Sequence, residues 1–374
     1  MRMALIPHLC GKNKMSETAK EIIRYFNTEG EIIDIKPLGN GLINKTFLAS
    51  SNTEKYVLQK INGNVFKQIK TLVQNKSIVS GYLKQKGLIS PQFIDSVQQK
   101  SFYIDQDSDC WQLSEYIPKT STQEKISNPN IAKEAGRVIG EFHNALKYLP
   151  QSKLGFTIKD FHNTLLRFKQ LILTINKDSA SRVLTSTGEI ERIISFAEEV
   201  MPLAAKIEKK EIPVRIVHND TKINNILFDN HEKAICMIDL DTVMPGSILH
   251  DFGEAMRSGA NMGEEDDPDL ANVSFNISLF ENFSQGYLGI ANDFLTEAEL
   301  HYLPLSVKLI TFEQAVRFLS DYLSGDIYYT TDYTEHNLIR ARAQIKLYQS
   351  VSQNYSGIQS IIASNKKARS NDLA

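Results

Sequence analysis

The feature that most constrains the fold of this 374-residue chain is a polar loop, 218–225, that leads directly into a predicted β-hairpin. The apolar runs 226–228 and 234–238 flank a polar turn, which is the pattern of two paired strands. Asn225 begins the first strand, and Asp239 ends the second. Because a hairpin folds the chain back on itself, we expect these two oxygen-bearing side chains to lie close together, as a magnesium site requires.

The loop has the residue types that phosphoryl transfer needs. Transfer from ATP to an alcohol requires a carboxylate that holds the attacking hydroxyl, and cations that offset the charge of the phosphate oxygens. The protein kinase catalytic loop has the pattern HRDLxxxxN, and His218, Asp220 and Asn225 occupy the matching positions. Asp220 is the predicted base, and Lys222 would contact the transferred phosphate. The predicted metal ligands are Asn225, Asp239 and Asp241, the last on the same side of an extended chain as Asp239. The alternative is a solvent-facing hairpin with ordinary acidic residues.

Composition favours a cytoplasmic enzyme that acts on small molecules. The length suggests two lobes. With 42 basic and 44 acidic residues, the net charge of -2 gives no footprint for nucleic acid or an anionic membrane. Cys10, Cys110 and Cys236 are too far apart for a zinc motif or a disulfide framework. No apolar run is long enough to span a bilayer. We therefore expect ATP and a small molecule as partners, without nucleic acid, membrane or an obligate protein partner.

A first lobe is predicted over residues 16–117 and is expected to bind the nucleotide. Its first two strands, 31–38 and 45–49, are separated by a turn that contains Gly39, Gly41 and Asn44. A strand follows these glycines where a Rossmann turn would need a helix, so a turn over the ATP phosphates fits better. An ordinary hairpin turn is the alternative. At the end of the lobe, Glu115 and Ile117 are the residues expected to meet adenine through their backbone.

Lys60 in the next strand is the candidate for the lysine that pairs with the ATP phosphates. Alternation places Lys60 and Gln59 on opposite faces of the strand, and the sequence leaves open which face meets the nucleotide. A solvent-facing Lys60 is therefore the alternative. The helix expected at 65–86 should supply a glutamate for this lysine, but it contains no Asp or Glu. Gln74 or Asn75 could take that place with a hydrogen bond.

A second, mainly helical lobe is predicted over 118–355. Apolar and small residues in 131–146 form stripes at helical spacing, which indicates core packing. Asp251, in an Asp-Phe-Gly sequence, is expected to cap a helix that begins at Gly253 and to have no role at the metal. The tail, 356–374, is rich in Ser, Asn and Lys and is expected to fray.

Longer sequence strings resemble the aminoglycoside phosphotransferase and choline kinase branch of the kinase-like proteins, and within it the N-acetylhexosamine 1-kinases. The strings are 218–229, 238–246, 160–164 and 317–326, the last leading to 336–338 and Arg340, and the resemblance covers about 31–347. It implies an α+β, bilobal protein kinase-like fold, with a small antiparallel sheet lobe containing one helix and a larger, mainly helical lobe. It also implies ATP and Mg²⁺ as cofactors, and phosphorylation of the anomeric hydroxyl of an N-acetylhexosamine, GlcNAc or GalNAc, to the sugar 1-phosphate.

Sugar hydroxyls are best held by Arg, Asp and Asn side chains and by a stacked aromatic ring. For Arg317, the alternative is a salt-bridge ladder with Glu313 and Asp321, since the three are spaced at i, i+4 and i+8. For His162 and its neighbour Asn163, the alternative is a role at the start of a helix. Besides Asp220, the expected sugar contacts are Arg317, Asp321, Tyr328, His336, Asn337, Arg340 and His162.

Two other functions fit parts of the sequence. An aminoglycoside or choline kinase would need acidic groups for its cationic acceptor, and the run 264–269 contains five. The flanking Gly263 and Pro268 favour a solvated loop instead. A nucleotide-binding module without catalysis would explain the missing helix glutamate. Such a module would have no need to keep Asp220, Asn225 and Asp239 together.

Overall fold

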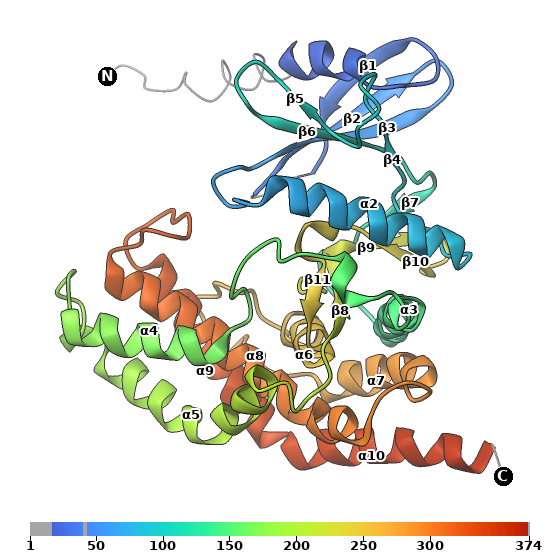
Figure 1. Ribbon diagram of the computed structural model, residues 1–374. Coiled ribbons are helices and arrows are strands. Elements are labelled where there is room, and N and C mark those ends of the chain that lie inside the picture. The colour runs from blue at the N-terminus through green and yellow to red at the C-terminus, as the bar shows by residue number, and fades with distance from the viewer. Residues whose placement is uncertain (1–16, 40–42, 373–374) are drawn as a thin grey trace. The chain divides into compact units, whose positions relative to one another are not determined.

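The computed structural model describes residues 17–39 and 43–372, and the chain divides into two compact units (Figure 1). The first unit runs to Thr120 and also includes Leu149–Lys159 and Ile238–Met244. The second contains Ser121–Tyr148, Asp160–Met237 and the chain from Pro245 onward. The lobe boundary predicted after residue 117 stays a prediction. Sequence analysis did not foresee the two later segments that join the first unit, and one of them carries Asp239 and Asp241.

The first unit contains an antiparallel sheet with strand order β1-β2-β3-β6-β4, and β5 also pairs with β6. The strands are β1 (Ile32–Pro37), β2 (Lys45–Ser51), β3 (Lys55–Ile61), β4 (Phe93–Ile94), β5 (Tyr103–Ile104) and β6 (Cys110–Glu115). Its long helix is α2 (Ile69–Gln85), and residues 17–22 are also helical, followed by the 3-10 turn η1 (Ile23–Tyr25). Two further 3-10 turns are η2 (Gln151–Lys153) and η5 (Leu240–Thr242).

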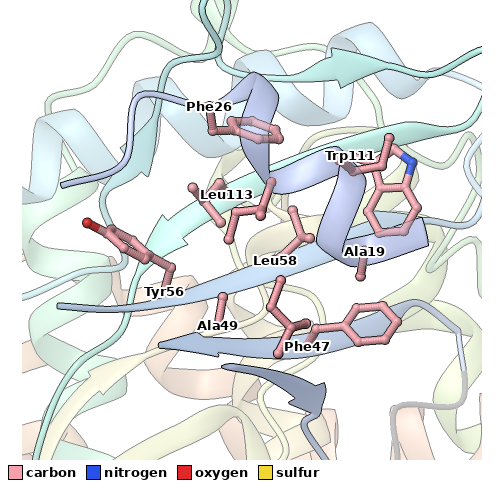
Figure 2. Close-up of a cluster of buried hydrophobic side chains, with 11 residues drawn as sticks. Ala19, Phe26, Phe47, Ala49, Tyr56, Leu58, Trp111 and Leu113 are labelled. Carbon is pink, nitrogen blue, oxygen red and sulfur yellow. The ribbon is translucent and has the colours of Figure 1, made fainter. Parts of the chain in front are cut away.

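The register of the sheet decides which side chains share each of its two faces. Phe47 pairs with Leu58, and Leu58 pairs with Leu113, so these side chains share one face. Residues 17–26 cover that face, and Figure 2 shows Ala19 and Phe26 beside Leu58 and Leu113. Each large apolar side chain buried here contributes roughly 1.5–3 kcal/mol to folding. The opposite face of β3 presents Gln59 to α2, which fixes the orientation of the strand.

The second unit is mainly helical. Its helices are α3 (Pro129–Leu146), α4 (Thr164–Lys177), α5 (Thr187–Glu208), α6 (Ile248–Gly259), α7 (Ile277–Ala291), α8 (Glu297–Ser324), α9 (His336–Gln353) and α10 (Tyr355–Asp372). The predicted hairpin is β9 (Ile226–Asp229) with β10 (Ala234–Met237). The remaining short elements are β7 (Thr120–Ser121), β8 (Arg215–Val217), β11 (Met244–Gly246), η3 (Leu184–Ser186) and η4 (Ile223–Asn225). No helix within the described ranges is both long and apolar enough to cross a membrane.

Small residues allow α3 and α7 to approach closely. A Cβ atom on Gly136 would come within 2.1 Å of the main-chain oxygen of Phe283, and one on Gly286 within 1.9 Å of that of Lys133. No side chain fits at these distances, so the glycines are required for the crossing. The prediction that the small-residue stripe of 131–146 serves core packing agrees with this contact.

The tail does not fray as expected. Residues 355–372 form α10, where Ile358 and Ile362 are 0% and 5% exposed. The two isoleucines are spaced at i, i+4 and therefore lie on one face of the helix. The prediction was based on the polar composition of the tail and overlooked this spacing.

Candidate active site

The predicted catalytic loop is well defined within the second unit. Asn225, in η4, donates from its side-chain nitrogen to the main-chain oxygen of Asp220 at 2.8 Å and to a carboxylate oxygen of Asp220 at 3.0 Å. The Asp220 side chain is 32% exposed, and Lys222 Nζ lies 3.7 Å from its other oxygen. The charge of Asp220 raises the pKa of Lys222, so this lysine stays cationic. The carboxylate is thus oriented on one side and open on the other.

Asp251 holds the backbone of this loop. Its buried carboxylate accepts hydrogen bonds from the backbone amides of His218 at 2.7 Å and Asn219 at 2.6 Å. Thr221 Oγ1 donates to the main-chain oxygen of Asp251 at 2.6 Å. Asn219 has a φ of 64°, so these bonds also stabilise an uncommon backbone conformation next to Asp220.

The predicted role of Asp251 as a helix cap was wrong. Helix α6 begins at Ile248 and is capped by Ser247, which places Asp251 in its first turn. His143 Nε2 lies 2.8 Å from the carboxylate, and Tyr287 contacts the other ring nitrogen at 3.1 Å. Burial raises the pKa of Asp251, but the His143 hydrogen bond and charge outweigh this effect and leave the pKa lowered. The carboxylate therefore stays ionised and serves the loop.

His162 supports the same loop from another side. Its Nδ1 lies 2.8 Å from Glu313 Oε1, and its Nε2 lies 3.1 Å from the main-chain oxygen of Asn219. Both partners are acceptors, so both ring nitrogens donate and the ring is an imidazolium. Burial lowers the pKa of His162, but the Glu313 charge outweighs it and the pKa is raised. The structure thus gives both nitrogens protein partners, where sequence analysis expected a sugar contact.

Asn163 and Glu313 also have structural partners. Asn163 caps α4 by accepting a hydrogen bond from the Leu166 amide at 3.0 Å, which is the helix-start role considered as the alternative. Glu313 accepts from Thr164 Oγ1 at 2.5 Å in addition to His162. Burial raises the pKa of Glu313, but the His162 charge lowers it overall to about 2.

The expected ladder around Arg317 does not form in the part of the chain that the structure describes. Glu313 is engaged by His162, and Asp321 accepts hydrogen bonds from the backbone amides of residues 327–329 at 2.8–3.0 Å. Arg317 instead lies over the rings of Phe161 and Tyr329, at 5.6 and 5.7 Å. The aromatic faces therefore position its guanidinium, and one of its donors, Nη1, reaches Gln314 Oε1 at 3.4 Å.

Most of the other expected sugar contacts have protein partners. Asn337 is 0% exposed and donates to Asp321 at 2.9 Å and Asp326 at 3.0 Å. His336 Nε2 lies 2.8 Å from Asp266, and Arg340 donates to the main-chain oxygen of Thr330 and to Asn337, both at 3.1 Å. These contacts anchor the loop between α8 and α9. In contrast, Tyr328 is 66% exposed.

Acidic residues of the run 264–269 form ion pairs with basic groups of the same unit. Glu265 pairs with Arg257 at 3.0 Å, Glu264 pairs with Lys125, and Asp266 pairs with His336. Asp267 accepts the backbone amide of Asp269 at 3.0 Å. Three of the five carboxylates therefore have cationic or histidine partners, and a fourth shapes the turn.

In the first unit, β3 presents Gln59 and Lys60 to opposite faces. The Lys60 ammonium pairs with Asp109 and lies 5.7 Å from the centre of the Trp111 ring. Gln59 Oε1 accepts a hydrogen bond from Lys76 Nζ of α2 at 2.9 Å. The register thus favours the alternative considered for Lys60, in which this lysine turns away from α2.

A different lysine and carboxylate form the buried pair of this unit. Lys76 Nζ lies 2.5 Å from Asp241 Oδ1, and both residues are 3% exposed. Asn44 donates to the other oxygen of Asp241, and Asn62 donates its backbone amide to Asn44 at 2.8 Å. Asn44 and Asp241, expected at the nucleotide and the metal, therefore contact each other. Sequence analysis missed Lys76, although its position in the apolar stripe Leu72, Val79 and Leu83 marks it as buried.

Other nucleotide-binding predictions remain open. Gly39 has a φ of 68°, which suits glycine, whereas Gly41 lies outside the described residues. Glu115 ends β6 and donates its backbone amide to Gln92 at 2.9 Å, and the main-chain oxygen of Ile117 accepts from Thr120 at 2.7 Å. Of the helix residues proposed to assist Lys60, Asn75 instead donates to the main-chain oxygens of Gly155 and Val243 at 2.8 and 2.9 Å.

With this geometry in view, the chain belongs to the phosphotransferase enzyme family, whose model matches residues 34–287. It is an enzyme that transfers a phosphoryl group, as the loop predicted. Similar folds include a kinase of amicoumacin, solved with AMP-PNP, Ca²⁺ and Ami, at 13% identity over 91% of this chain and 96% of that one, with a TM-score of 0.62.

Two further solved structures are similar. A microcompartment-associated aminopropanol kinase is 14% identical over 92% of this chain and 98% of its own, with a TM-score of 0.64. A choline kinase from Cryptosporidium parvum is 18% identical over 91% and 97%, with a TM-score of 0.57. The predicted protein kinase-like fold, with an antiparallel sheet lobe and a mostly helical part, is confirmed.

Proposed function

We propose that this phosphotransferase uses ATP and Mg²⁺ to phosphorylate the anomeric hydroxyl of an N-acetylhexosamine. The observation that carries the proposal is the state of Asp220, whose carboxylate is oriented by Asn225 at 3.0 Å yet remains 32% exposed. A base must be fixed in direction and still be reachable by the attacking hydroxyl. The resemblance of the sequence strings to N-acetylhexosamine 1-kinases supports this choice of acceptor.

In this proposal, Asp220 orients the anomeric hydroxyl and accepts its proton. The hydroxyl oxygen forms a bond to the terminal phosphorus of ATP as the bond from that phosphorus to the bridging oxygen breaks, and ADP leaves. Lys222 stays cationic beside Asp220, and its ammonium offsets negative charge on the transferred group. Asp251 and His162 keep the loop backbone in place through His218 and Asn219.

Asn225 and Asp239 are the proposed magnesium ligands, and their chemistry suits the ion. Both offer oxygen atoms, which Mg²⁺ prefers, and the bound ion would neutralise charge on the phosphate oxygens. The Asn225 amide nitrogen faces Asp220, which leaves the oxygen of the same amide for a cation. We no longer propose Asp241 as a ligand, because Lys76 and Asn44 engage its two oxygens.

The charges near the predicted base favour a neutral acceptor. The acidic run that would suit an aminoglycoside or choline is engaged by Arg257, Lys125 and His336. Arg317 offers a forked set of donors and Tyr328 an exposed ring, which are groups that hold sugar hydroxyls and the faces of sugar rings. We therefore retain Arg317 and Tyr328 as the proposed sugar contacts. A kinase of another alcohol, such as an aminoglycoside or choline, is the second candidate, because similar folds include a choline kinase.

An ATP-consumption screen tests the choice of acceptor. The purified chain is incubated with Mg-ATP and, separately, with N-acetylglucosamine, N-acetylgalactosamine, glucose, galactose, choline and an aminoglycoside. The proposal predicts that the highest kcat/KM belongs to one of the two N-acetylhexosamines. A kcat/KM at least tenfold higher for choline or the aminoglycoside would favour the second candidate and contradict the sugar assignment.

A further inference from the structure

We propose that Lys76, carried by α2, supplies the ammonium that contacts the ATP phosphates, with Asp241 as its carboxylate partner. This inference rests on the proposed use of ATP. In the kinase arrangement, the lysine comes from the third strand and its carboxylate partner from the helix. In this chain, the helix provides the lysine, and the carboxylate comes from the segment that also carries Asp239.

The geometry of Lys76 suits a phosphate contact. An ammonium has three donors, and two of them are used by Asp241 Oδ1 at 2.5 Å and Gln59 Oε1 at 2.9 Å. The third donor can meet a phosphate oxygen while the pair stays intact. Lys76 is 3% exposed, so Asp241 is needed to keep its charge in a buried position.

The neighbours of Lys76 are the parts of the unit expected at the phosphates. Asn44 follows the glycine turn and donates to the same carboxylate as Lys76. Asp241 itself stands two residues after Asp239, the proposed metal ligand. Asn75, beside Lys76 on α2, holds the main-chain oxygen of Val243 at 2.9 Å. Within the first unit, the Asp241 carboxylate therefore joins Lys76 of α2 to Asn44, which follows the glycine turn.

The competing explanation is that Lys76 only pins the segment 238–244 to α2. A purely structural lysine would affect stability, and any loss of nucleotide affinity would be similar for adenosine and for MgAMP-PNP. If Lys76 contacts a phosphate, its substitution would weaken the binding of MgAMP-PNP and leave the binding of adenosine unaffected. The ratio of these two affinities therefore separates the explanations.

The chain offers a rescue variant and a matched control. In Gln59→Lys/Lys76→Gln, the ammonium moves from α2 to β3, where the 2.9 Å contact between the two side chains lets it reach the same carboxylate. This variant keeps the buried ion pair, so it remains informative even if Lys76→Gln alone unfolds. Lys84→Gln removes an exposed lysine from the same helix.

The experiment measures the affinities of full-length variants for MgAMP-PNP and adenosine by calorimetry, with thermal melting to confirm folding. Lys76→Gln should weaken MgAMP-PNP about 10- to 100-fold, the effect of one charge-assisted hydrogen bond, and leave adenosine within about twofold. If Lys76→Gln folds, the transposed double variant should bind MgAMP-PNP at least about fivefold more tightly than this single variant. If Lys76→Gln does not fold, the double variant should bind within about tenfold of the parent. Lys84→Gln should match the parent.

Two results would overturn the inference: equal effects of Lys76→Gln on both ligands, including no effect, or a folded double variant that binds MgAMP-PNP no better than the single variant. Failure of the parent chain to bind MgAMP-PNP would instead contradict the proposed function.

Discussion

The side chain of Asn225 donates to Asp220 twice, at 2.8 Å to its main-chain oxygen and at 3.0 Å to its carboxylate. This relationship fixes the direction of the carboxylate by a residue five positions later in the chain, which the short turn η4 brings back to it. The same contact turns the Asn225 amide so that its oxygen is left for a cation. The proposed base and the proposed metal ligand are therefore oriented by one pair of hydrogen bonds.

We expect Asp220→Asn to lower kcat about 10²- to 10⁴-fold, the usual contribution of a general base. The substitution preserves the size of the side chain, so the affinity for MgAMP-PNP should stay close to that of the parent. Steady-state kinetics with the best acceptor and calorimetry with MgAMP-PNP check both statements. Near-normal turnover by Asp220→Asn would contradict the proposed role of Asp220 as the base.

Asp251→Asn should loosen the loop, because the buried carboxylate receives two backbone amides and faces His143. Removing one partner of a buried charged pair costs about 3–5 kcal/mol. The melting temperature should fall by at least about 6 °C, together with kcat. The control is Glu191→Gln, an exposed acid on α5, which should leave both unchanged. An unchanged melting temperature for Asp251→Asn would contradict this account.

The His162 imidazolium makes stability depend on pH. Its pKa is raised in the folded protein, so its contribution is fully present below the ordinary pKa of about 6.5 and is lost as the pH rises through the folded value. Glu313 and Glu254 favour its charge, whereas His250 opposes it but is neutral, because burial lowers the pKa of His250 to about 3.

Thermal melting between about pH 6 and pH 9 tests this pH dependence. The parent should lose stability above about pH 6.5, and His162→Gln, which cannot titrate, should lose less. His301→Gln, an exposed histidine on α8, should keep the profile of the parent. Identical profiles for the parent and His162→Gln would show that the imidazolium does not contribute.

Lys60→Ala should leave the affinity for MgAMP-PNP within about threefold of the parent. The substitution removes only the partly exposed ion pair with Asp109, which is expected to contribute less than about 1 kcal/mol. The physical reason is that the Lys60 ammonium pairs with Asp109 on the face of β3 opposite to Gln59. Calorimetry measures the affinity. A loss of affinity of tenfold or more would indicate that Lys60 contacts the ATP phosphates.

Arg317→Ala should raise the KM for the sugar about 10- to 100-fold, as expected for a charge-assisted donor to a ligand. The KM for Mg-ATP should not change. Arg192→Ala, an exposed arginine on α5, is the matched control and should leave both constants unchanged. A sugar KM within about twofold of the parent would leave Arg317 with a structural role over Phe161 and Tyr329.

The sequence was sufficient for the features that depend on local patterns. The hairpin after Asn225, the first three strands of the sheet lobe and its helix α2 were predicted close to their observed bounds, because alternation and helical spacing are properties of neighbouring residues. The Asn225–Asp220 contact also spans only five residues. These local features were enough to indicate a phosphotransferase of the kinase-like fold.

Contacts between distant segments could not be predicted in this way. Asp251 supports the loop directly and is itself paired with His143, which lies 108 positions earlier in the chain. Lys76 meets Asp241 across 165 positions, and no local pattern pairs them. Gln59, and not Lys60, lies on the face of β3 that meets α2. Strand alternation places the two side chains on opposite faces but cannot predict which face meets the helix. For a similar reason, the sequence could not show that Asn337 and Asp321, two of the expected sugar contacts, bind each other and anchor a loop.

The most direct test of the central claim is phosphorus NMR of the product formed from Mg-ATP and the preferred N-acetylhexosamine. The account predicts a signal coupled to the anomeric proton of the sugar, formed by the parent and reduced at least about 100-fold in rate with Asp220→Asn. A phosphate on any other carbon, or the same product formed at an unchanged rate by Asp220→Asn, would contradict it.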